Sequence, residues 1–337
     1  MMMQRPFLLA VAACVACTQH ADRADSSRTT VASTSSGSVE PGVRGKLPPN
    51  RMGRIPILEV HVVRDQANGE FIIARSTFQH ALQTLYDRGY RPITVAQLLD
   101  RDFRDVPAGM SPVVFTFDDA SPEQFSYIEN NGQLEIDPKS EVGMWMDFNK
   151  QHPDWKPRAT FCLLPGAGAG HAFFGDNPKW NGQKKEWRFQ KVKWLADNGF
   201  ELCNHTLWHA TLSNYPDAVV QEQIARGAIA IDSAVPGYKI RTFALPLGVW
   251  PKNRALAWNG SWTNPKTGKT TSYTNETVLE VSGGPVPSPF DPKFEKNRLT
   301  RFIVEGNELD RLLDQLDKPG PAARFVWDGG NSASAAR

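Results

Sequence analysis

The chain has 337 residues, of which 40% are hydrophobic and 22% are charged. A chain of this length and composition can bury a substantial core, as one large domain or two modest ones. The formal net charge is only +2, and the chain contains no long block of Lys and Arg. Nucleic acids and anionic membrane surfaces are therefore not expected as partners, because proteins that bind polyanions carry a strong basic patch.

The N-terminal segment predicts an export signal. Residues 1–17, MMMQRPFLLAVAACVAC, combine one positive charge at Arg5 with a brief apolar stretch and small residues that lead into cysteines. The apolar stretch is too short for a membrane-spanning helix. The string VAAC ending at Cys14 resembles a bacterial lipobox, with Cys17 as the alternative lipidation site, and an unlipidated signal peptide is the other interpretation. We therefore expect an exported protein of the periplasm or cell envelope, anchored by an N-terminal lipid.

Residues 18–50 are rich in Ser, Thr and Gly and almost lack large apolar side chains. Such a segment cannot bury enough surface to fold, so it predicts a disordered tether. The folded domain is expected over residues 51–330, and residues 331–337 are expected to form a disordered tail.

Within the folded domain, strand-like and helix-like stretches alternate. Strands are expected at residues 55–63, 113–119, 159–164, 201–206, 241–248, 298–305 and 323–329, and helices at 76–90, 184–200, 218–235 and 308–317. In the first helix, Ser76 is the expected cap and Gly89 the expected end. Residues 120–158 predict a long loop region, and residues 259–289 predict a polar loop insertion that borders a pocket. This alternation favours a parallel sheet with helices packed outside it.

The first candidate motif is VVFTFDDA, residues 113–120. Its apolar part predicts a strand buried on both faces, yet the strand ends in Asp118 and Asp119. Two neighbouring carboxylates repel each other, so both stay ionised only beside a cation, within a hydrogen-bond network or in water. The motif is therefore either a solvated turn or a site in which a metal binds one carboxylate and catalysis uses the other.

The second candidate motif is NHTLWH, residues 204–209, in which His205 and His209 are four residues apart. Two imidazoles at this spacing lie on one side of a helical turn and can share one cation. In a parallel barrel, the loops at the carboxyl ends of the strands meet around one pocket. One carboxylate and two imidazoles with an open position are typical of a catalytic metal.

Cys162 and Cys203 remain in the body of the chain, each within a strand-like run. They could form one disulfide in an oxidising compartment. Two buried free thiols are favoured here, because the sequence does not show the geometry that a disulfide requires.

At the two motifs, and in the strings ILEVHVV, RATFCLLPG and LADNGFELCNHT, the chain resembles the polysaccharide deacetylase family of carbohydrate esterases, the NodB-homology domain. The resemblance extends from about residue 55 to residue 330. It implies an α/β fold, a distorted barrel of seven or eight strands of the polysaccharide deacetylase type.

The resemblance also implies a reaction and a set of roles. Asp118 would be the catalytic base, and Asp119, His205 and His209 would bind a divalent metal, with Zn²⁺ as the expected ion. The implied reaction is metal-dependent hydrolysis of acetyl groups from an N-acetylated polysaccharide or peptidoglycan-type glycan.

Two departures from the family pattern stand out. The third motif reads FALPLG at residues 243–248, where the family has an Arg that orients the catalytic Asp and an aromatic residue whose backbone N–H binds the oxyanion. Leu247 keeps a backbone N–H for the oxyanion role, and Arg241 is the candidate to reach Asp118. The family's late His, which protonates the leaving amine, is missing, and His61 and Asp328 are the candidate proton donors by position.

These departures leave two alternative functions open. The chain could be a catalytically weak or inactive glycan-binding protein of the same fold, or a deacylase or esterase that acts on a substrate other than a polysaccharide.

Overall fold

The computed structural model describes residues 47–69, 71–166, 172–176, 179 and 182–330. The expected signal peptide with Cys14 and Cys17, nearly all of the expected tether and the expected tail lie outside the described residues. Within the described part of the chain, no helix combines the length and the apolar character needed to cross a bilayer.

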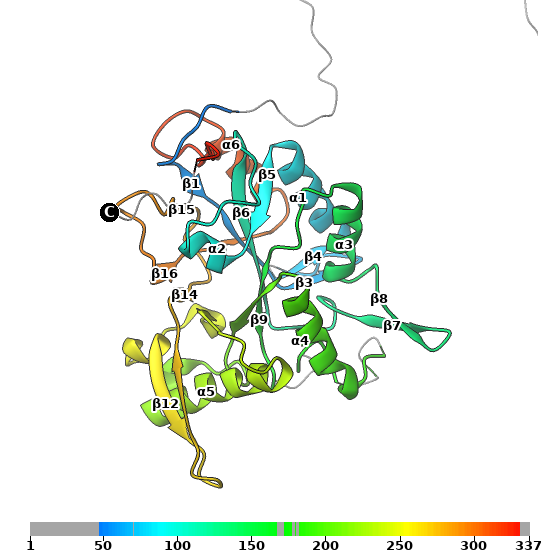
Figure 1. The fold of residues 1–337 in the computed structure, drawn as a ribbon, viewed down its shortest axis with the longest axis vertical. Coiled ribbons are helices and arrows are strands. Elements are labelled where there is room, and N and C mark those ends of the chain that lie inside the picture. The colour runs from blue at the N-terminus through cyan, green and yellow to red at the C-terminus, as the bar shows by residue number, and fades with distance from the viewer. Residues whose placement is uncertain (1–46, 70, 167–171, 177–178, 180–181, 331–337) are drawn as a thin grey trace, which may run out of the picture. The chain divides into compact units, whose positions relative to one another are not determined.

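A curled sheet of parallel strands forms the centre of the domain (Figure 1). Its strands follow the order β16–β14–β11–β10–β9–β6–β2–β17, and β5 pairs with β6 beside this path. The strands are β2 (Ile57–Val60), β5 (Tyr90–Ile93), β6 (Ser111–Asp118), β9 (Thr160–Leu163), β10 (Glu201–Asn204), β11 (Thr242–Ala244), β14 (Thr277–Leu279), β16 (Arg298–Leu299) and β17 (Phe302–Ile303). The parallel sheet expected from the alternating pattern is present, and it curls into the barrel that the family resemblance implies.

The last barrel strand is broken in two. The sequence predicts one strand over residues 298–305, but β16 and β17 are separated by Thr300 and Arg301. β16 pairs with β14, and β17 pairs with β2, so the two halves lie at opposite ends of the sheet path. The ends of the path are therefore joined by the chain itself. The sheet has nine strands, or eight when β16 and β17 are counted as one.

Helices lie on the outside of this sheet (Figure 1). They are α1 (Arg75–Asp87), α2 (Val95–Leu99), α3 (Glu141–Gln151), α4 (Arg188–Asp197), α5 (Asp217–Ala234) and α6 (Glu308–Leu316), with short 3₁₀ helices at Lys185–Trp187, Leu212–Asn214, Pro246–Gly248 and Arg254–Ala257. Ser76 is not the cap of α1, because the helix begins at Arg75 with Ala74 as its N-cap. Gly89 follows the end of α1 with φ of 76°, as expected for a helix C-terminus.

Smaller strand pairs decorate the barrel. They are β1 (Arg54–Ile55) with β15 (Val286–Pro287), β3 (Val62–Arg64) with β4 (Ile72–Ala74), β7 (Tyr127–Asn130) with β8 (Gln133–Ile136), and β12 (Asn259–Thr263) with β13 (Thr270–Thr274). The β7–β8 and β12–β13 hairpins project from the barrel (Figure 1).

These elements correct four predictions made from the sequence. The expected strand at residues 55–63 is divided among β1, β2 and β3, and the expected loop at 120–158 contains β7, β8 and α3. The expected loop insertion at 259–289 contains a hairpin and the barrel strand β14. The segment 323–329 makes only isolated bridges, through Arg324 and Val326. Short runs such as Thr277–Leu279 carry too little pattern to be told from a loop.

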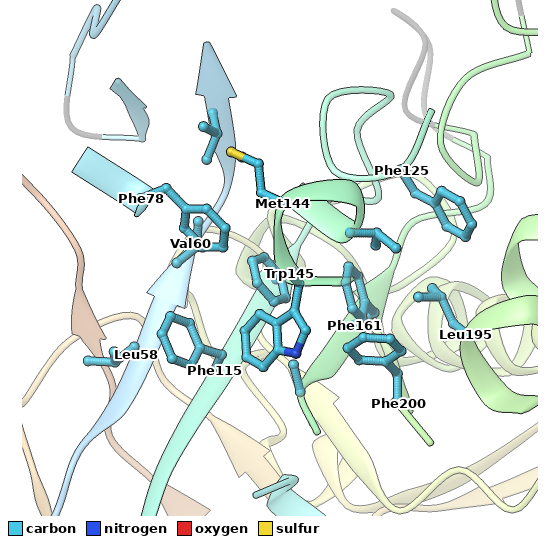
Figure 2. Packing of buried hydrophobic residues seen from close by; sticks show 14 of the residues in the cluster. Leu58, Val60, Phe78, Phe115, Phe125, Met144, Trp145, Phe161, Leu195 and Phe200 are labelled. Carbon is cyan, nitrogen blue, oxygen red and sulfur yellow. The ribbon is translucent and has the colours of Figure 1, made fainter. Parts of the chain in front are cut away.

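Two apolar layers follow from the alternation of side chains along each strand. One face of β2, β6 and β9 packs outward against the helices, where Phe115 and Phe161 meet Trp145 and Phe200 (Figure 2). The other face points into the barrel lumen, which holds Ile57, Val114, Ala244, Leu279 and Leu299 among other side chains.

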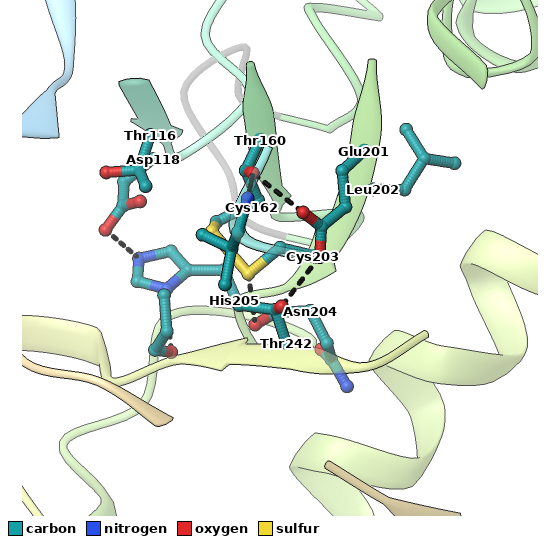
Figure 3. Close-up of a disulfide and its surroundings, with 12 residues drawn as sticks. Thr116, Asp118, Thr160, Cys162, Glu201, Leu202, Cys203, Asn204, His205 and Thr242 are labelled. Atoms are coloured by element: carbon teal, nitrogen blue, oxygen red, sulfur yellow. Dashed lines mark hydrogen bonds and ion pairs between the residues drawn. A yellow bond between two sulfur atoms is a disulfide. The ribbon is translucent and has the colours of Figure 1, made fainter. Parts of the chain in front are cut away.

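Cys162 and Cys203 form a disulfide in the lumen (Figure 3). They are directly opposite each other in the parallel pairing of β9 and β10, with Cα atoms 4.1 Å apart. The expectation of two free thiols is therefore wrong. The pairing register that brings the two residues together cannot be seen in the sequence.

Candidate metal and catalytic site

Polar side chains gather at the carboxyl ends of the barrel strands. Asp118 ends β6 and Asp119 follows it, His205 follows β10, and His61 follows β2. Because these strands are parallel, their carboxyl ends open at one mouth of the barrel. The two sequence motifs that were expected to share a site are thus brought together.

Asp119, His205 and His209 form a cluster of three potential metal ligands. Asp119 Oδ1 lies 3.4 Å from His205 Nε2 and 3.5 Å from His209 Nε2. Ligand atoms bound tetrahedrally to zinc at about 2.0–2.2 Å lie about 3.3–3.6 Å apart. Asp119 Oδ1 and His205 Nε2 are both buried, and neither has a hydrogen-bond partner among the described residues. The spacing, the donor types and the unpartnered atoms all fit one divalent metal ion.

The protonation states of the two imidazoles also bear on metal binding. His205 Nδ1 lies 3.0 Å from the carbonyl oxygen of Ala244, to which it donates, so Nε2 is the atom that faces the metal site. Although burial alone would lower the pKa of His205, the charges of Asp118 and Asp119 raise it in the metal-free protein, so metal binding displaces a proton from Nε2. Burial, together with the charge of His205, lowers the pKa of His209 to about 4. His209 is therefore neutral near pH 7, as a metal ligand must be. Although burial favours the neutral acid, His205 holds the pKa of Asp119 below its ordinary value.

The backbone around the site adopts the left-handed region at several residues other than glycine. The φ values are 81° for Asp119, 69° for Thr206, 61° for His209 and 57° for Leu247. Residues 206–208 form a turn, so the expected helical placement of the two imidazoles is wrong. The turn nevertheless brings their ring centroids to 4.9 Å. Such conformations cost stability and gather at functional sites.

Asn204 and Gly227 fix the turn that carries the imidazoles. Asn204 Nδ2 donates to the carbonyl oxygen of Ile224 in α5, and Asn204 Oδ1 accepts from the backbone N–H of Thr206. A Cβ atom at Gly227 would lie 2.3 Å from Asn204 Oδ1. Only glycine allows α5 to approach this side chain so closely.

Asp118 lies beside the three ligands and is held by Arg301, a residue that the sequence analysis did not single out. Arg301 Nη1 donates to Asp118 Oδ1 at 2.8 Å, and Nη2 donates to Oδ2 at 2.9 Å. Burial alone would raise the pKa of Asp118, but the charges of Arg301 and His205 outweigh it and keep the carboxylate ionised near pH 7. The alternation of Leu299, Arg301 and Ile303 in the expected strand could have indicated that Arg301 faces the lumen.

Glu59 is a second acidic residue that the sequence analysis did not single out. It is buried in β2 and is two residues before His61, so both side chains face the lumen. Glu59 Oε1 lies 3.5 Å from His61 Nε2, and Oε2 lies 3.1 Å from Arg301 Nε. Burial raises the pKa of Glu59 to about 8 against the attraction of Arg301, and burial lowers the pKa of His61.

A cavity of about 340 Å³ opens at this mouth. Its polar lining consists of Glu59, His61, Asp118, Asp119, His205 and His209. Its remaining lining is apolar and comes from Val62, Phe71, Ile72, Leu245, Leu247 and Val281. The cavity is therefore large enough for a small ligand and presents its charged groups on one side of apolar walls.

Residues 156–259 match the family model described as polysaccharide deacetylase. The matched segment contains His205 and His209 but not Asp118 or Asp119, which the structure places beside them. The resemblance to the polysaccharide deacetylase family is confirmed.

Solved structures of the deacetylase type share the fold. A protein of Bacillus anthracis assigned as a polysaccharide deacetylase has a TM-score of 0.51 at 16% identity, and the match covers 75% of this chain and 65% of that one. A polysaccharide deacetylase of Bacillus cereus has a TM-score of 0.50 at 17% identity, with the same coverage of 75% and 65%. IcaB of Ammonifex degensii has a TM-score of 0.51 at 16% identity, with 78% and 96% covered.

The chain spans less than two thirds of the length of the two Bacillus structures, at 65% of each. No sequence of a curated protein matches the chain. The fold of the polysaccharide deacetylase type, a distorted (β/α) barrel, is nevertheless shared with these structures, as the sequence predicts.

The third family motif is placed at the same mouth. Ala244, which stands where the deacetylase family has its Arg, lies buried in β11, and its carbonyl oxygen fixes His205. Leu247 borders the cavity with 59% of its surface exposed. Its location is compatible with the oxyanion role expected from the deacetylase pattern.

Arg241 and Asp328 lie at the other end of the barrel. Arg241 precedes β11 and forms ion pairs with Asp100 and Glu276. Asp328 forms an ion pair with Arg51 at 2.7 Å. The backbone N–H of the neighbouring Trp327 donates to the carbonyl oxygen of the residue just before β6. Neither residue reaches the deacetylase-like site, so the expectation that Arg241 orients Asp118 and that Asp328 is a proton donor is corrected.

Proposed function

We propose that the protein is a metal-dependent hydrolase that removes acetyl groups from an N-acetylated glycan of the polysaccharide or peptidoglycan type. The family match supports amide-bond hydrolysis of a glycan as the class of reaction. The observation that carries the proposal is the spacing of Asp119, His205 and His209 around room for one ion, with ionised Asp118 beside them.

The proposed base, Asp118, and the proposed oxyanion donor, the backbone N–H of Leu247, belong to residues that line the same cavity. Asp119, His205 and His209 would hold a divalent metal, with zinc as the expected ion, which would supply Lewis-acid chemistry when bound. Asp118 accepts the proton of the attacking water as it adds to the carbonyl carbon. The backbone N–H of Leu247 donates to the developing oxyanion at the cavity rim.

His61 is the proposed proton donor to the leaving amine. It lines the same cavity, and its Nδ1 is buried without a hydrogen-bond partner among the described residues. Asp328, the other candidate, is paired with Arg51 at the opposite end of the barrel. To give its proton to the amine as the C–N bond breaks, His61 must be in the imidazolium form, which burial opposes and the charges of Asp118 and Asp119 favour by raising its pKa. Acetate is the second product.

Export to an oxidising compartment completes the proposal. The Cys162–Cys203 disulfide supports it, because disulfides persist in the periplasm and at cell surfaces. The only proposed link to a membrane is a lipid at Cys14 or Cys17, and no nucleic-acid partner is proposed.

The test is metal content paired with acetate release from chito-oligosaccharides. Asp119→Ala and His205→Ala are expected to lose stoichiometric Zn²⁺ and all measurable acetate release, because each removes one of three ligands. Asp328→Ala is the matched control, since it removes a carboxylate at the other end of the barrel and is expected to keep both. Full metal content in the Asp119→Ala and His205→Ala variants would show that these residues do not bind the metal.

A deacylase for longer acyl amides is the second candidate, favoured by the apolar walls of the cavity. It is separated from the first by comparing amide substrates with acetyl, butyryl and hexanoyl groups, together with the matching esters. A rate that increases with chain length would favour the second candidate. Glycan binding without release of any acid would identify the protein as a non-catalytic glycan-binding member of the fold.

A further inference from the structure

Arg301 occupies an unusual position in the barrel. It lies in the two-residue break between β16 and β17, where the chain crosses from β14 at one end of the sheet path to β2 at the other. Its side chain is fully buried, with 0% exposed. A buried charge is costly unless it is paired, so the contacts of this guanidinium must account for its presence.

Every nitrogen of the Arg301 guanidinium has an acceptor. Nε donates to the carbonyl oxygen of Glu280 at 2.7 Å, and Nη1 is within 3.2 Å of Thr116 Oγ1. Nη1 and Nη2 also donate to the two carboxylate oxygens of Asp118 at 2.8 Å and 2.9 Å. This bidentate geometry fixes both the position and the rotation of the Asp118 carboxylate.

The same guanidinium reaches a second carboxylate. Arg301 Nε lies 3.1 Å from Glu59 Oε2, and Glu59 Oε1 lies 3.5 Å from Nε2 of His61. Asp118 and Glu59 are both 1% exposed and come from neighbouring strands, β6 and β2. Arg301 therefore lies between Asp118, the proposed base, and Glu59. Glu59 in turn contacts His61, the proposed proton donor.

We propose that Arg301 is a positioning residue that holds the base Asp118 directly and the proton donor His61 through Glu59, so that one side chain in the broken last strand sets the geometry of both. This proposal rests on the proposed function, which assigns the roles of Asp118 and His61. Lysine could not replace Arg301, because one ammonium cannot match both oxygens of Asp118 and also reach the Glu59 side.

Arg301→Lys and Arg301→Met test the proposal by steady-state kinetics of acetate release. For the folded, Zn²⁺-loaded variants, kcat is expected to fall about a hundredfold or more while KM stays within about threefold, because Arg301 is fully buried and does not line the cavity. Arg298→Met is the matched control, since Arg298 lies in the same broken strand but pairs with Glu295 at the surface. It is expected to keep the wild-type kcat. A kcat within threefold of wild type in both Arg301 variants would overturn the proposal.

Removal of a buried cation could prevent folding, so a second variant is included. Glu59→Gln combined with Arg301→Met removes Arg301 together with the second carboxyl group that it contacts and leaves Asp118 in place. It is expected to fold, to bind Zn²⁺ with unchanged stoichiometry and to show the same loss in kcat. Normal kcat in this double variant would likewise contradict the positioning role.

A readout without activity separates this proposal from the proposed function. Asp118→Asn, Arg301→Met and the variant that combines these two changes form a thermodynamic cycle in urea unfolding of metal-free protein. The combined variant is expected to lose less stability than the sum of the single losses, because each single change leaves a buried partner unpaired. Additive losses of stability would contradict the proposed pairing of Arg301 with Asp118. If the wild-type protein releases no acid from any substrate, the proposed function is wrong. The thermodynamic cycle still shows whether Arg301 and Asp118 stabilise each other.

Discussion

The two ends of the barrel lumen each hold a buried carboxylate, and their surroundings differ. Glu201, near the amino ends of the strands, accepts hydrogen bonds from the backbone of Ala96 at 2.8 Å, from Thr160 at 2.9 Å and from Thr242 at 2.7 Å. Glu59, near the carboxyl ends, has no hydrogen bond to either oxygen among the described residues.

The disulfide lies between these two regions. Figure 3 shows Glu201 with Thr160 and Thr242 on one side of it, and Asp118 with His205 on the other. Both carboxylate oxygens of Glu201 are hydrogen-bonded and link β10 to β9 and β11, whereas Glu59, Asp119 and His205 at the open mouth have buried atoms without a hydrogen-bond partner among the described residues. Unpartnered buried groups reduce stability, so the mouth is where the fold gives up stability for binding and catalysis.

The largest expected effect comes from the mouth. Asp118→Asn keeps the shape of the side chain but removes the base, so kcat should fall about a hundred- to ten-thousandfold with Zn²⁺ content unchanged. Acetate release and metal analysis measure this. Glu201→Gln, the same chemical change at the closed end, should leave kcat within about threefold. Equal losses of kcat in Asp118→Asn and Glu201→Gln would contradict the proposed difference between the two ends of the lumen.

The next-largest effect is expected at the disulfide, which lies between the two ends of the barrel lumen. Replacing Cys162 and Cys203 by Ala should lower the free energy of unfolding by about 3–4 kcal/mol, because the disulfide closes a loop with a sequence separation of 41. Urea unfolding with and without reductant measures it. The reductant should cost wild type a similar amount and leave the double variant unchanged. No difference between oxidised and reduced wild type would contradict this expectation.

A smaller loss is expected at the closed end. Glu201→Ala leaves the backbone N–H of Ala96 and the hydroxyls of Thr160 and Thr242 without their acceptor, so unfolding free energy should fall by about 2–3 kcal/mol. Glu201→Gln retains an acceptor oxygen and should lose less. Chemical denaturation of the three proteins side by side measures the order. A Gln variant as unstable as the Ala variant would show that these hydrogen bonds contribute little.

A pH dependence of stability is also expected at the mouth. Burial raises the pKa of Glu59 from its ordinary 4.5 to about 8. Between these values the folded protein holds a proton that the unfolded chain releases, so the contribution of Glu59 is fully present below pH 4.5 and is lost as pH rises through about 8. The stability of metal-free wild type relative to Glu59→Gln should therefore decline over this window. A constant difference from pH 5 to pH 8 would contradict the shift.

Much of the site could be predicted from the sequence, because its ligands sit in short motifs at strand ends. Asp118, Asp119, His205 and His209 are recognisable from their residue types and from the apolar runs that precede them, and the structure gathers them at one mouth. The turn that carries His209 could not be predicted, since its left-handed residues are held by tertiary contacts from α5.

The parts of the fold and site that could not be predicted depend on the register of the strands and on the closure of the sheet into a barrel. Arg301 and Glu59 lie in strand-like runs and carry no motif, and their pairing joins positions 242 residues apart (301 minus 59). The Cys162–Cys203 bond requires a register that only the folded sheet defines. Arg241 was a reasonable candidate by proximity along the chain, but the length of β11 places it at the opposite end from Asp118.

The broken last strand also bears on how the domain opens. β17 contributes two residue pairs to β2, and β16 contributes two to β14, so the seam of the ring has few backbone hydrogen bonds compared with the pairing of β2 and β6. Segments with few such bonds open at lower free energy than the rest of a domain. Amide protons of residues 298–303 should therefore exchange with solvent before those of β6 and β9. Each opening of this seam would carry Arg301 away from Asp118 and interrupt the active geometry while the outer apolar core stays intact.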